Sequence, residues 1–272
     1  MEGALSPSKP IDLATLVAIA VVAYAVANLV HEGLGHGGAC LLAGGRPLAL
    51  SAIHFEEDPG SLGATAQKWV AAGGTIANVA LGVLALLALR ATRQATSARY
   101  FLWLFATVNL LQAAGYWLFS GLGNVGDWAA VIEGLAPHGA FRLGLALVGG
   151  TAYVGVVVLS LRELAPFLGS GAERMRRAVA LTLIPYLAGG ILYVAAGIPN
   201  PVGWRLVLIS AAAASFGGTS GLAWMAQLLR NGTRFPPREG EPKALQRSIP
   251  WLAAGAVVAL VFVLVLGPGI RF

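Results

Sequence analysis

Long apolar runs separated by short polar loops dominate this chain. A transmembrane helix needs about 20 consecutive apolar residues, and seven runs approach or exceed that length. The pattern therefore predicts an all-α, polytopic membrane protein with about seven transmembrane helices. The runs cover residues 12–43, 69–89, 100–120, 141–161, 178–197, 205–229 and 249–268.

The composition supports this reading and excludes other classes. Of the 272 residues, 57% are hydrophobic and 11% are charged, whereas soluble domains carry about 25% charged residues. Such a chain is neither disordered nor a soluble globular domain, and its one cysteine, Cys40, excludes a disulfide scaffold. The first run exceeds the 7–15 apolar residues of a signal-peptide core, so we expect a retained helix. We expect residues 1–272 to form a single transmembrane domain.

Basic residues are distributed unevenly between the two sides of the predicted membrane. Thirteen of the 18 Lys and Arg residues fall on the side of the N-terminus. Excess positive charge marks the cytoplasmic side, which predicts a cytoplasmic N-terminus and a C-terminus outside. Because the basic residues lie in loops between apolar runs, we expect anionic lipids and not nucleic acid as their partners. The five basic residues of the other side are Arg46, Lys68, Arg142, Arg205 and Arg271.

Three ionisable residues interrupt the first apolar run: His31, Glu32 and His36. Ionisable groups within a membrane segment are costly and usually functional. Two imidazoles can bind Zn²⁺ and an adjacent glutamate can act as general base. The alternative is a pair of core histidines bonded to backbone carbonyls, with Glu32 paired to one of them.

The spacing of the two histidines places a condition on the metal-site hypothesis. Zinc-protease helices usually carry H-E-x-x-H, but His31 and His36 are five residues apart, or about 140° apart on an ideal α-helix. A π-bulge, which inserts one residue into a turn, would bring them together. Gly33 and Gly35 make this distortion easier.

Residues 20–135 resemble the site-2 protease family of intramembrane metalloproteases. Beyond the histidine motif, residues 72–82 (AGGTIANVALG) are similar to the A-G-P-x-x-N segment of that family, with Gly74 in place of proline. Asp127 follows the third run, where the family carries its third zinc ligand, although Trp128 replaces the glycine that normally comes next. A short extended or hairpin segment is expected near residues 46–58.

The resemblance implies a division of the chain and a set of site residues. Residues 12–135 would form the metalloprotease-like core and residues 140–272 additional spans. The metal would be Zn²⁺, with Glu32 as the catalytic base, and Asn78 and Asn124 would contact substrate or stabilise developing negative charge. The expected metal ligands are His31, His36 and Asp127.

Several of these residues also have structural interpretations. Asp127 could cap a short helix, Asn124 could be a turn residue, and Asn78 and Asn109 could form interhelical hydrogen bonds. Cys40 could be a packing residue of the core or a thiolate ligand of the metal. The polar loop that contains His54, Glu56, Glu57 and Asp58 could be a solvated loop, a substrate-facing edge or a second metal patch, and His138 is expected to be a loop residue. An interfacial aromatic belt would suit the large aromatic residues near the span ends, which are Tyr116, Trp117, Trp128, Trp204 and Trp251.

Two functions follow from these residues. The first is an intramembrane zinc metalloprotease that cleaves a peptide bond in or near a transmembrane helix of a membrane-protein substrate. The second is a catalytically inactive metal-binding scaffold or a transporter with the same fold, which the altered histidine spacing favours. Glu32 discriminates between them, because only a hydrolase needs its carboxylate.

Overall fold

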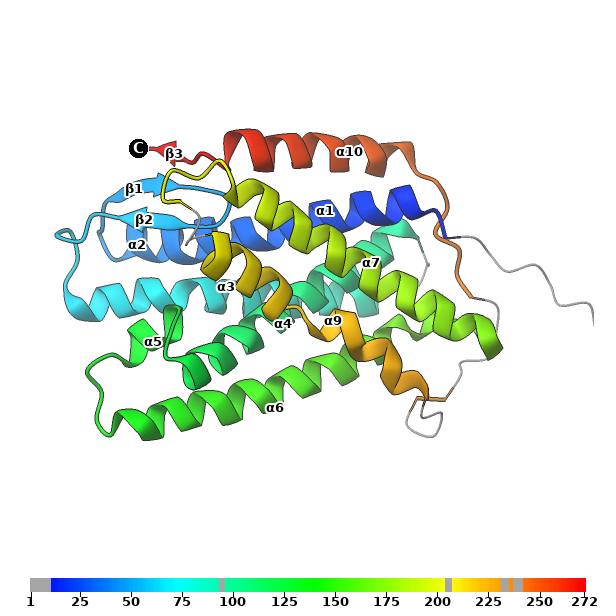
Figure 1. The fold of residues 1–272 in the computed structure, drawn as a ribbon, viewed down its shortest axis with the longest axis horizontal. Helices are drawn as coiled ribbons and strands as arrows, with labels where there is room; N and C mark the ends of the chain where they lie inside the picture. The colour runs from blue at the N-terminus through cyan, green and yellow to red at the C-terminus, as the bar shows by residue number, and fades with distance from the viewer. Residues whose placement is uncertain (1–10, 93–95, 204–206, 231–234, 237–241) are drawn as a thin grey trace, which may run out of the picture.

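The computed structural model describes residues 11–92, 96–203, 207–230, 235–236 and 242–272. In these ranges the fold is mostly helical, and five helical segments are long and apolar enough to cross a membrane. This arrangement, drawn in Figure 1, is that of a multi-pass membrane protein. The five segments are Leu13–Leu42, Ala64–Ala91, Ser97–Gly123, His138–Phe167 and Glu173–Gly197.

These segments combine α-helices with short π- and 3₁₀-helical turns. The first contains α1 (Leu13–Leu29), the π-helix η1 (Val30–Gly37) and α2 (Gly38–Leu42). The second and third are α3 (Ala64–Ala91) and α4 (Ser97–Gly123). The fourth and fifth are α6 (His138–Leu164) with η2 (Ala165–Phe167), and α7 (Gly171–Gly197). The short α5 (Asp127–Ile132) connects α4 to α6.

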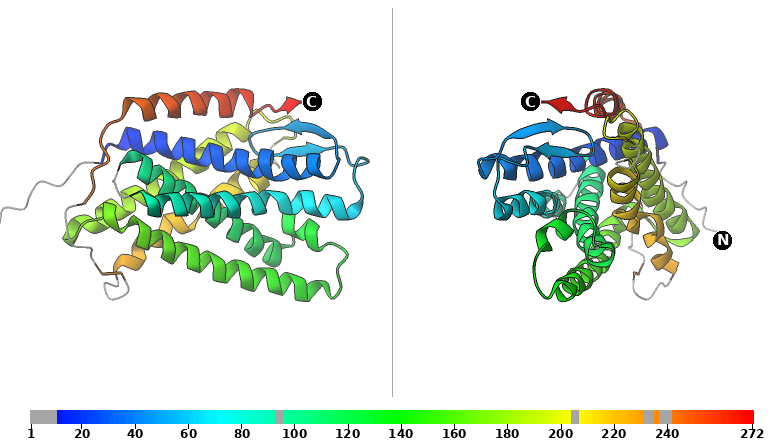
Figure 2. Two further views of the ribbon diagram at one scale, coloured as in Figure 1. Left: turned by 180° about the vertical axis from the view of Figure 1, so that it is seen from behind. Right: turned by 60° about the vertical axis from the view of Figure 1, so that its left-hand side comes forward.

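Two of the seven expected spans are shorter or broken in the structure. The expected span 249–268 forms α10 (Ile249–Leu260) and η5 (Val261–Val265). The expected span 205–229 is divided into η3 (Val207–Gly217), α9 (Gly221–Trp224) and η4 (Met225–Arg230), and its first residues, 205 and 206, lie outside the described ranges. Both segments nevertheless lie beside the long helices and run between the same two ends of the bundle (Figures 1 and 2).

The expected extended segment near 46–58 is confirmed as a β-hairpin. Strands β1 (Pro47–Leu50) and β2 (Phe55–Glu57) pair antiparallel, and β3 (Ile270–Arg271) adds to the other edge of β1. The sheet order is therefore β2-β1-β3. The sequence analysis did not predict β3. Figure 1 shows the sheet at the end of the bundle where α2 and α5 also lie.

The core surrounds α1, which packs against α4, α7 and α10. Asp12 caps its N-terminus by accepting a hydrogen bond from the Thr15 backbone N–H (2.8 Å). Large, fully buried aromatic side chains contribute to this core, among them Tyr24 of α1, Trp103 of α4 and Tyr193 of α7. By contrast, α6 carries many exposed apolar side chains, such as Leu143 and Leu147, as expected of a helix that faces lipid.

Candidate metal centre

The π-helical turn η1 brings His31 and His36 to the same side of the first membrane segment. In this turn the Gly38 N–H donates to the Gly33 carbonyl, five residues earlier. Residues five apart therefore lie one above the other. The distortion that the histidine spacing required is thus present, and the two Nε2 atoms are 3.1 Å apart.

Close packing of glycines brings α3 against this turn. A Cβ atom on Gly74 would lie 2.6 Å from His31 Nε2 and 2.7 Å from His36 Nε2. Gly35 and Gly73 meet backbone to backbone at the same crossing. The small residues at 73 and 74 are what allow the imidazoles to lie on the surface of α3.

A tight turn after α4 delivers Asp127 to the histidines. Asn124 adopts the left-handed conformation (φ 53°) and Gly126 has φ 80°, both typical of a sharp change in chain direction. The Ser120 hydroxyl donates to the Val125 carbonyl (2.9 Å) and closes the turn. Helix α5 then begins at Asp127, and Gly126, not Asp127, occupies the capping position. The Asp127 carboxylate is thereby free to face the two imidazoles.

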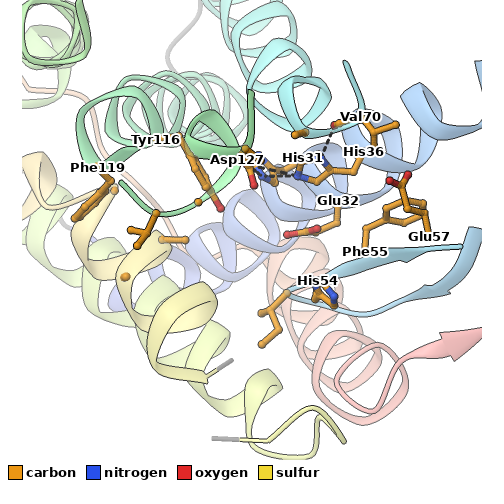
Figure 3. A pocket seen from close by; sticks show the side chains of 18 of the residues that line it. His31, Glu32, His36, His54, Phe55, Glu57, Val70, Tyr116, Phe119 and Asp127 are labelled. Carbon is orange, nitrogen blue, oxygen red and sulfur yellow. Dashed lines mark hydrogen bonds and ion pairs between the residues drawn. The ribbon is translucent and has the colours of Figure 1, made fainter. Parts of the chain in front are cut away.

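Three potential ligand atoms converge at this point, as Figure 3 shows. Asp127 Oδ2 lies 3.2 Å from His31 Nε2 and 3.5 Å from His36 Nε2. Atoms bound to a tetrahedral zinc ion at 2.0–2.2 Å are about 3.3–3.6 Å from one another. The three observed separations, 3.1, 3.2 and 3.5 Å, lie in or just below that range, so a metal ion fits among the three atoms after a small outward shift.

Hydrogen bonds on the far side of each ring fix which nitrogen faces the centre. The Nδ1–H of His36 donates to the Val70 carbonyl (2.7 Å), and the Nδ1–H of His31 donates to Asn78 Oδ1 (2.7 Å). Each neutral imidazole then carries its lone pair on Nε2, which is the arrangement of metal-binding histidines. In this neutral form two lone pairs face Asp127 Oδ2, which has no hydrogen-bond partner among the described residues, and a cation, either a metal ion or a proton, would relieve the repulsion.

Burial and charge favour a deprotonated third ligand. His31 and His36 are 2% and 8% exposed, and the Asp127 side chain is 22% exposed. Burial raises the pKa of the Asp127 carboxyl, but hydrogen bonds from His31 and His36 and their positive charge, which they have when Nε2 also carries a proton, lower it by more. The net pKa lies below its usual range, so Asp127 is a carboxylate at neutral pH, as metal binding requires.

A cavity of about 400 Å³ opens beside the three residues. Glu32, only 7% exposed, points into it and makes no hydrogen bond or ion pair within the described parts of the chain. Strand β2 and the residue before it, His54, form one wall. The remaining walls come from α3, α4, α5, η3 and the turn before α5 and are mostly apolar; their apolar residues include Val70, Phe119, Val125, Ala130 and Ala213.

The other expected site residues lie at different distances from the cavity. Asn78 is fully buried behind His31 and does not line the cavity. Asn124 lies at the exposed end of α4, where its Oδ1 contacts His138 Nε2 (3.0 Å). Cys40 is buried in α2 and is not part of the metal-ligand group found among the described residues.

The polar loop has a divided environment. His54 and Glu57 line the cavity, whereas Glu56 is exposed and Asp58 pairs with Arg46. The hairpin therefore presents part of this loop to the candidate centre. It forms no second metal group with the other described residues.

Tyr116 is the residue of this site that the sequence analysis assigned elsewhere. Its position near the end of a span favoured an interfacial belt, but its ring stacks on His31 and lines the cavity. The spacing of apolar residues gives no signal for such a contact, because Tyr116 and His31 are far apart in sequence.

Comparison with known proteins gives no relative for this chain: no protein-family model, no curated protein and no solved structure matches it.

Proposed function

We propose that the protein is an intramembrane zinc metalloprotease that hydrolyses a peptide bond in or near a transmembrane segment of another membrane protein. One observation carries the proposal. The ligand atoms of His31, His36 and Asp127 converge at a cavity into which the Glu32 carboxylate, unpaired within the described ranges, also points. The resemblance of residues 20–135 to site-2 proteases supports the same conclusion.

The donor set suits zinc in a catalytic role. Two imidazole nitrogens and one carboxylate oxygen are a frequent catalytic zinc set, and they leave a fourth position open. When bound, zinc would supply a Lewis acid that polarises a carbonyl and lowers the pKa of a water molecule to about 7. Glu32 would accept a proton from the attacking water at its carboxylate and return it to the departing amine.

The walls of the cavity suit an extended peptide. An intact helix hides its carbonyls in i to i−4 hydrogen bonds, so a substrate helix must unwind before cleavage. Strand β2 is an outer strand of the sheet and lines the cavity. We propose that an unwound segment adds to β2 as a further strand, which would hold its backbone beside Glu32.

The five-residue histidine spacing favoured an inactive scaffold or transporter in the sequence. The π-helical turn η1 accommodates that spacing, so the spacing alone does not argue against catalysis. If the following experiment detects no hydrolysis, the inactive scaffold becomes the better-supported function.

The proposal is tested by Glu32→Gln in proteoliposomes that contain zinc and a pool of tagged single-span membrane proteins. We expect the variant to retain about one zinc per chain, while cleavage falls by about 100-fold or more, the usual contribution of a general base. Glu163→Gln, which removes a carboxylate that pairs with Arg90 outside the cavity, is the matched control and should cleave as the wild type does. Equal cleavage by Glu32→Gln would overturn the mechanism.

The metal part is tested separately by zinc analysis of the purified protein. Asp127→Asn should lose most of its zinc, because a neutral amide is a far weaker zinc ligand than a carboxylate. Asp58→Asn, which removes a carboxylate outside the centre, should retain it. A wild-type protein that takes up no zinc would overturn the metalloprotease proposal as a whole.

A further inference from the structure

A network of buried side chains continues inward from His31. Asn78 on α3 lies behind the imidazole, and Asn109 and Gln112 on α4 lie behind Asn78. Tyr193 on α7 completes the network. All four side chains are buried. Polar groups at such depth are costly unless each is hydrogen-bonded. The direction of each hydrogen bond therefore determines how the neighbouring amide is oriented.

One end of the network is anchored at the Phe105 carbonyl. Asn109 Nδ2 donates to this carbonyl (2.8 Å). Because a backbone carbonyl can only accept, the amide nitrogen of Asn109 must face it, and Oδ1 faces the other way. Asn109 Oδ1 then accepts a hydrogen bond from Asn78 Nδ2 (2.9 Å).

The other end is anchored at the Tyr24 carbonyl on α1. The Tyr193 hydroxyl donates to this carbonyl (2.9 Å). Its oxygen is then available as an acceptor for Gln112 Nε2 (3.1 Å). This fixes the amide of Gln112, whose Oε1 accepts a second hydrogen bond from Asn78 Nδ2 (3.3 Å).

Both anchors therefore force the same orientation on Asn78. Its nitrogen must face the two acceptor oxygens on α4, and its Oδ1 must face His31 Nδ1 (2.7 Å). A reversed amide would set oxygen against oxygen on α4 and present N–H groups to His31. His31 would then carry its proton on Nε2, where it could not bind a metal.

We propose that Asn109, Gln112 and Tyr193 are positioning residues that set the tautomer of His31 and thereby keep its Nε2 lone pair on the metal side. This inference rests on the metal centre of the proposed function, and it assigns to α4 and α7 a part in that centre. Two independent anchors act on one amide, so the loss of either should be tolerated better than the loss of both.

The test measures metal affinity and not activity. Purified variants are titrated with zinc against a chelator, and with cobalt(II), whose absorption spectrum reports the ligand geometry. Asn109→Leu removes the first anchor. Tyr193→Phe removes only the hydroxyl of the second and keeps the ring against Tyr24 and Phe262. Each single variant should weaken zinc binding by about threefold, and the double variant by about 10- to 100-fold, the usual range for outer-shell partners.

Thr107→Val is the matched control for this series. Thr107 is also buried on α4, donates to the Trp103 carbonyl (2.8 Å) and contacts the Ser160 hydroxyl (3.0 Å), but it does not join the network behind His31. Its loss should leave zinc affinity and the cobalt spectrum unchanged, although it removes a buried hydrogen bond just as the other variants do.

Asn78→Asp supplies the rescue that a purely structural role would not show. A carboxylate presents an acceptor to His31 in either orientation, so the tautomer no longer depends on the anchors. Its second oxygen would face Asn109 Oδ1 and Gln112 Oε1, so the comparison is made within the Asn78→Asp background. In this background the two anchor substitutions should cause no further loss of affinity.

The outcomes are distinct. A folded double variant that binds zinc as tightly as Thr107→Val overturns the inference and leaves the metal centre standing. If the double variant does not fold, the zinc affinity of Tyr193→Phe alone tests the inference. An affinity equal to that of the wild type would overturn it. A wild-type protein without metal binding overturns both proposals.

Discussion

The ring of Tyr116 lies flat on the imidazole of His31, with ring centroids 4.6 Å apart and planes inclined by 18°. His31 is thus held on three sides: by Tyr116 on its face, by Asn78 at Nδ1 and by His36 at its edge. A side chain so restrained loses little freedom on binding a metal ion.

Removal of the aromatic ring at position 116 should weaken this restraint. Stacked aromatic pairs contribute about 0.5–1.5 kcal/mol beyond their buried area, so Tyr116→Ala should lower zinc affinity by about three- to tenfold. Tyr116→Phe keeps the stacked ring and should bind zinc as the wild type does. Chelator competition measures both variants, and equal loss in the two would show that stacking is not the cause.

A single methyl group on Gly74 should displace both histidines. The added Cβ of Gly74→Ala would lie within 2.7 Å of both Nε2 atoms, and such overpacking costs about 1–3 kcal/mol. Zinc affinity should fall by about tenfold or more. Gly155→Ala on α6, where no atom lies within 4 Å of the added Cβ, is the control and should bind zinc normally. Normal binding by the Gly74 variant would mean that α3 does not support the imidazoles as described.

Deletion of one residue from the π-helical turn should preserve the metal centre. Without the exposed Leu34, the two histidines would be four residues apart and an ordinary α-helical turn would bring them together. We expect the deletion variant to retain about one zinc per chain. Deletion of the buried Ala25 from α1, which would rotate the preceding helix by about 100°, should abolish folding or binding. Loss of zinc from the Leu34 variant alone would show that the turn has a further role.

The orientation in the membrane can be read from two added cysteines. In a Cys40→Ser background, Gly60→Cys marks the loop after the hairpin and Ala98→Cys marks the start of α4, at the opposite end of the bundle (Figure 1). From the uneven distribution of basic residues we expect Ala98→Cys to face the cytoplasm. An impermeant maleimide should therefore label only Gly60→Cys in intact cells, and the reverse pattern would invert the predicted topology.

The sequence predicted those parts of the molecule whose signals are local. Hydropathy located the five long helices, and the rarity of ionisable residues in them pointed to His31, Glu32 and His36. The interpretation of Asn124 as a turn residue is confirmed by its left-handed conformation before Asp127. Each of these signals depends on a residue type or on its immediate neighbours.

The remaining features depend on contacts between distant segments. The hydrogen bond between Tyr193 and Gln112 joins residues 81 apart in sequence, and the pairing of Tyr24 with Thr219 joins residues 195 apart. Periodicity along one helix does not specify which residue of another helix it meets. For the same reason the sequence indicates that Asn78 and Asn109 could form interhelical hydrogen bonds, as they do with each other, but it does not identify their partners and does not predict β3. The broken segment 207–230 is as apolar as a regular span, so hydropathy alone did not reveal its breaks.

The pairing of β3 with β1 sets an order of assembly on the ribosome. The metal-centre residues all lie between positions 31 and 127, whereas β3 occupies positions 270–271. Synthesis proceeds from the N-terminus, so the three ligands leave the ribosome well before the strand that completes the sheet. During this interval one edge of β1 stays unpaired, and the three candidate ligands can come together while the hairpin is still open on both sides.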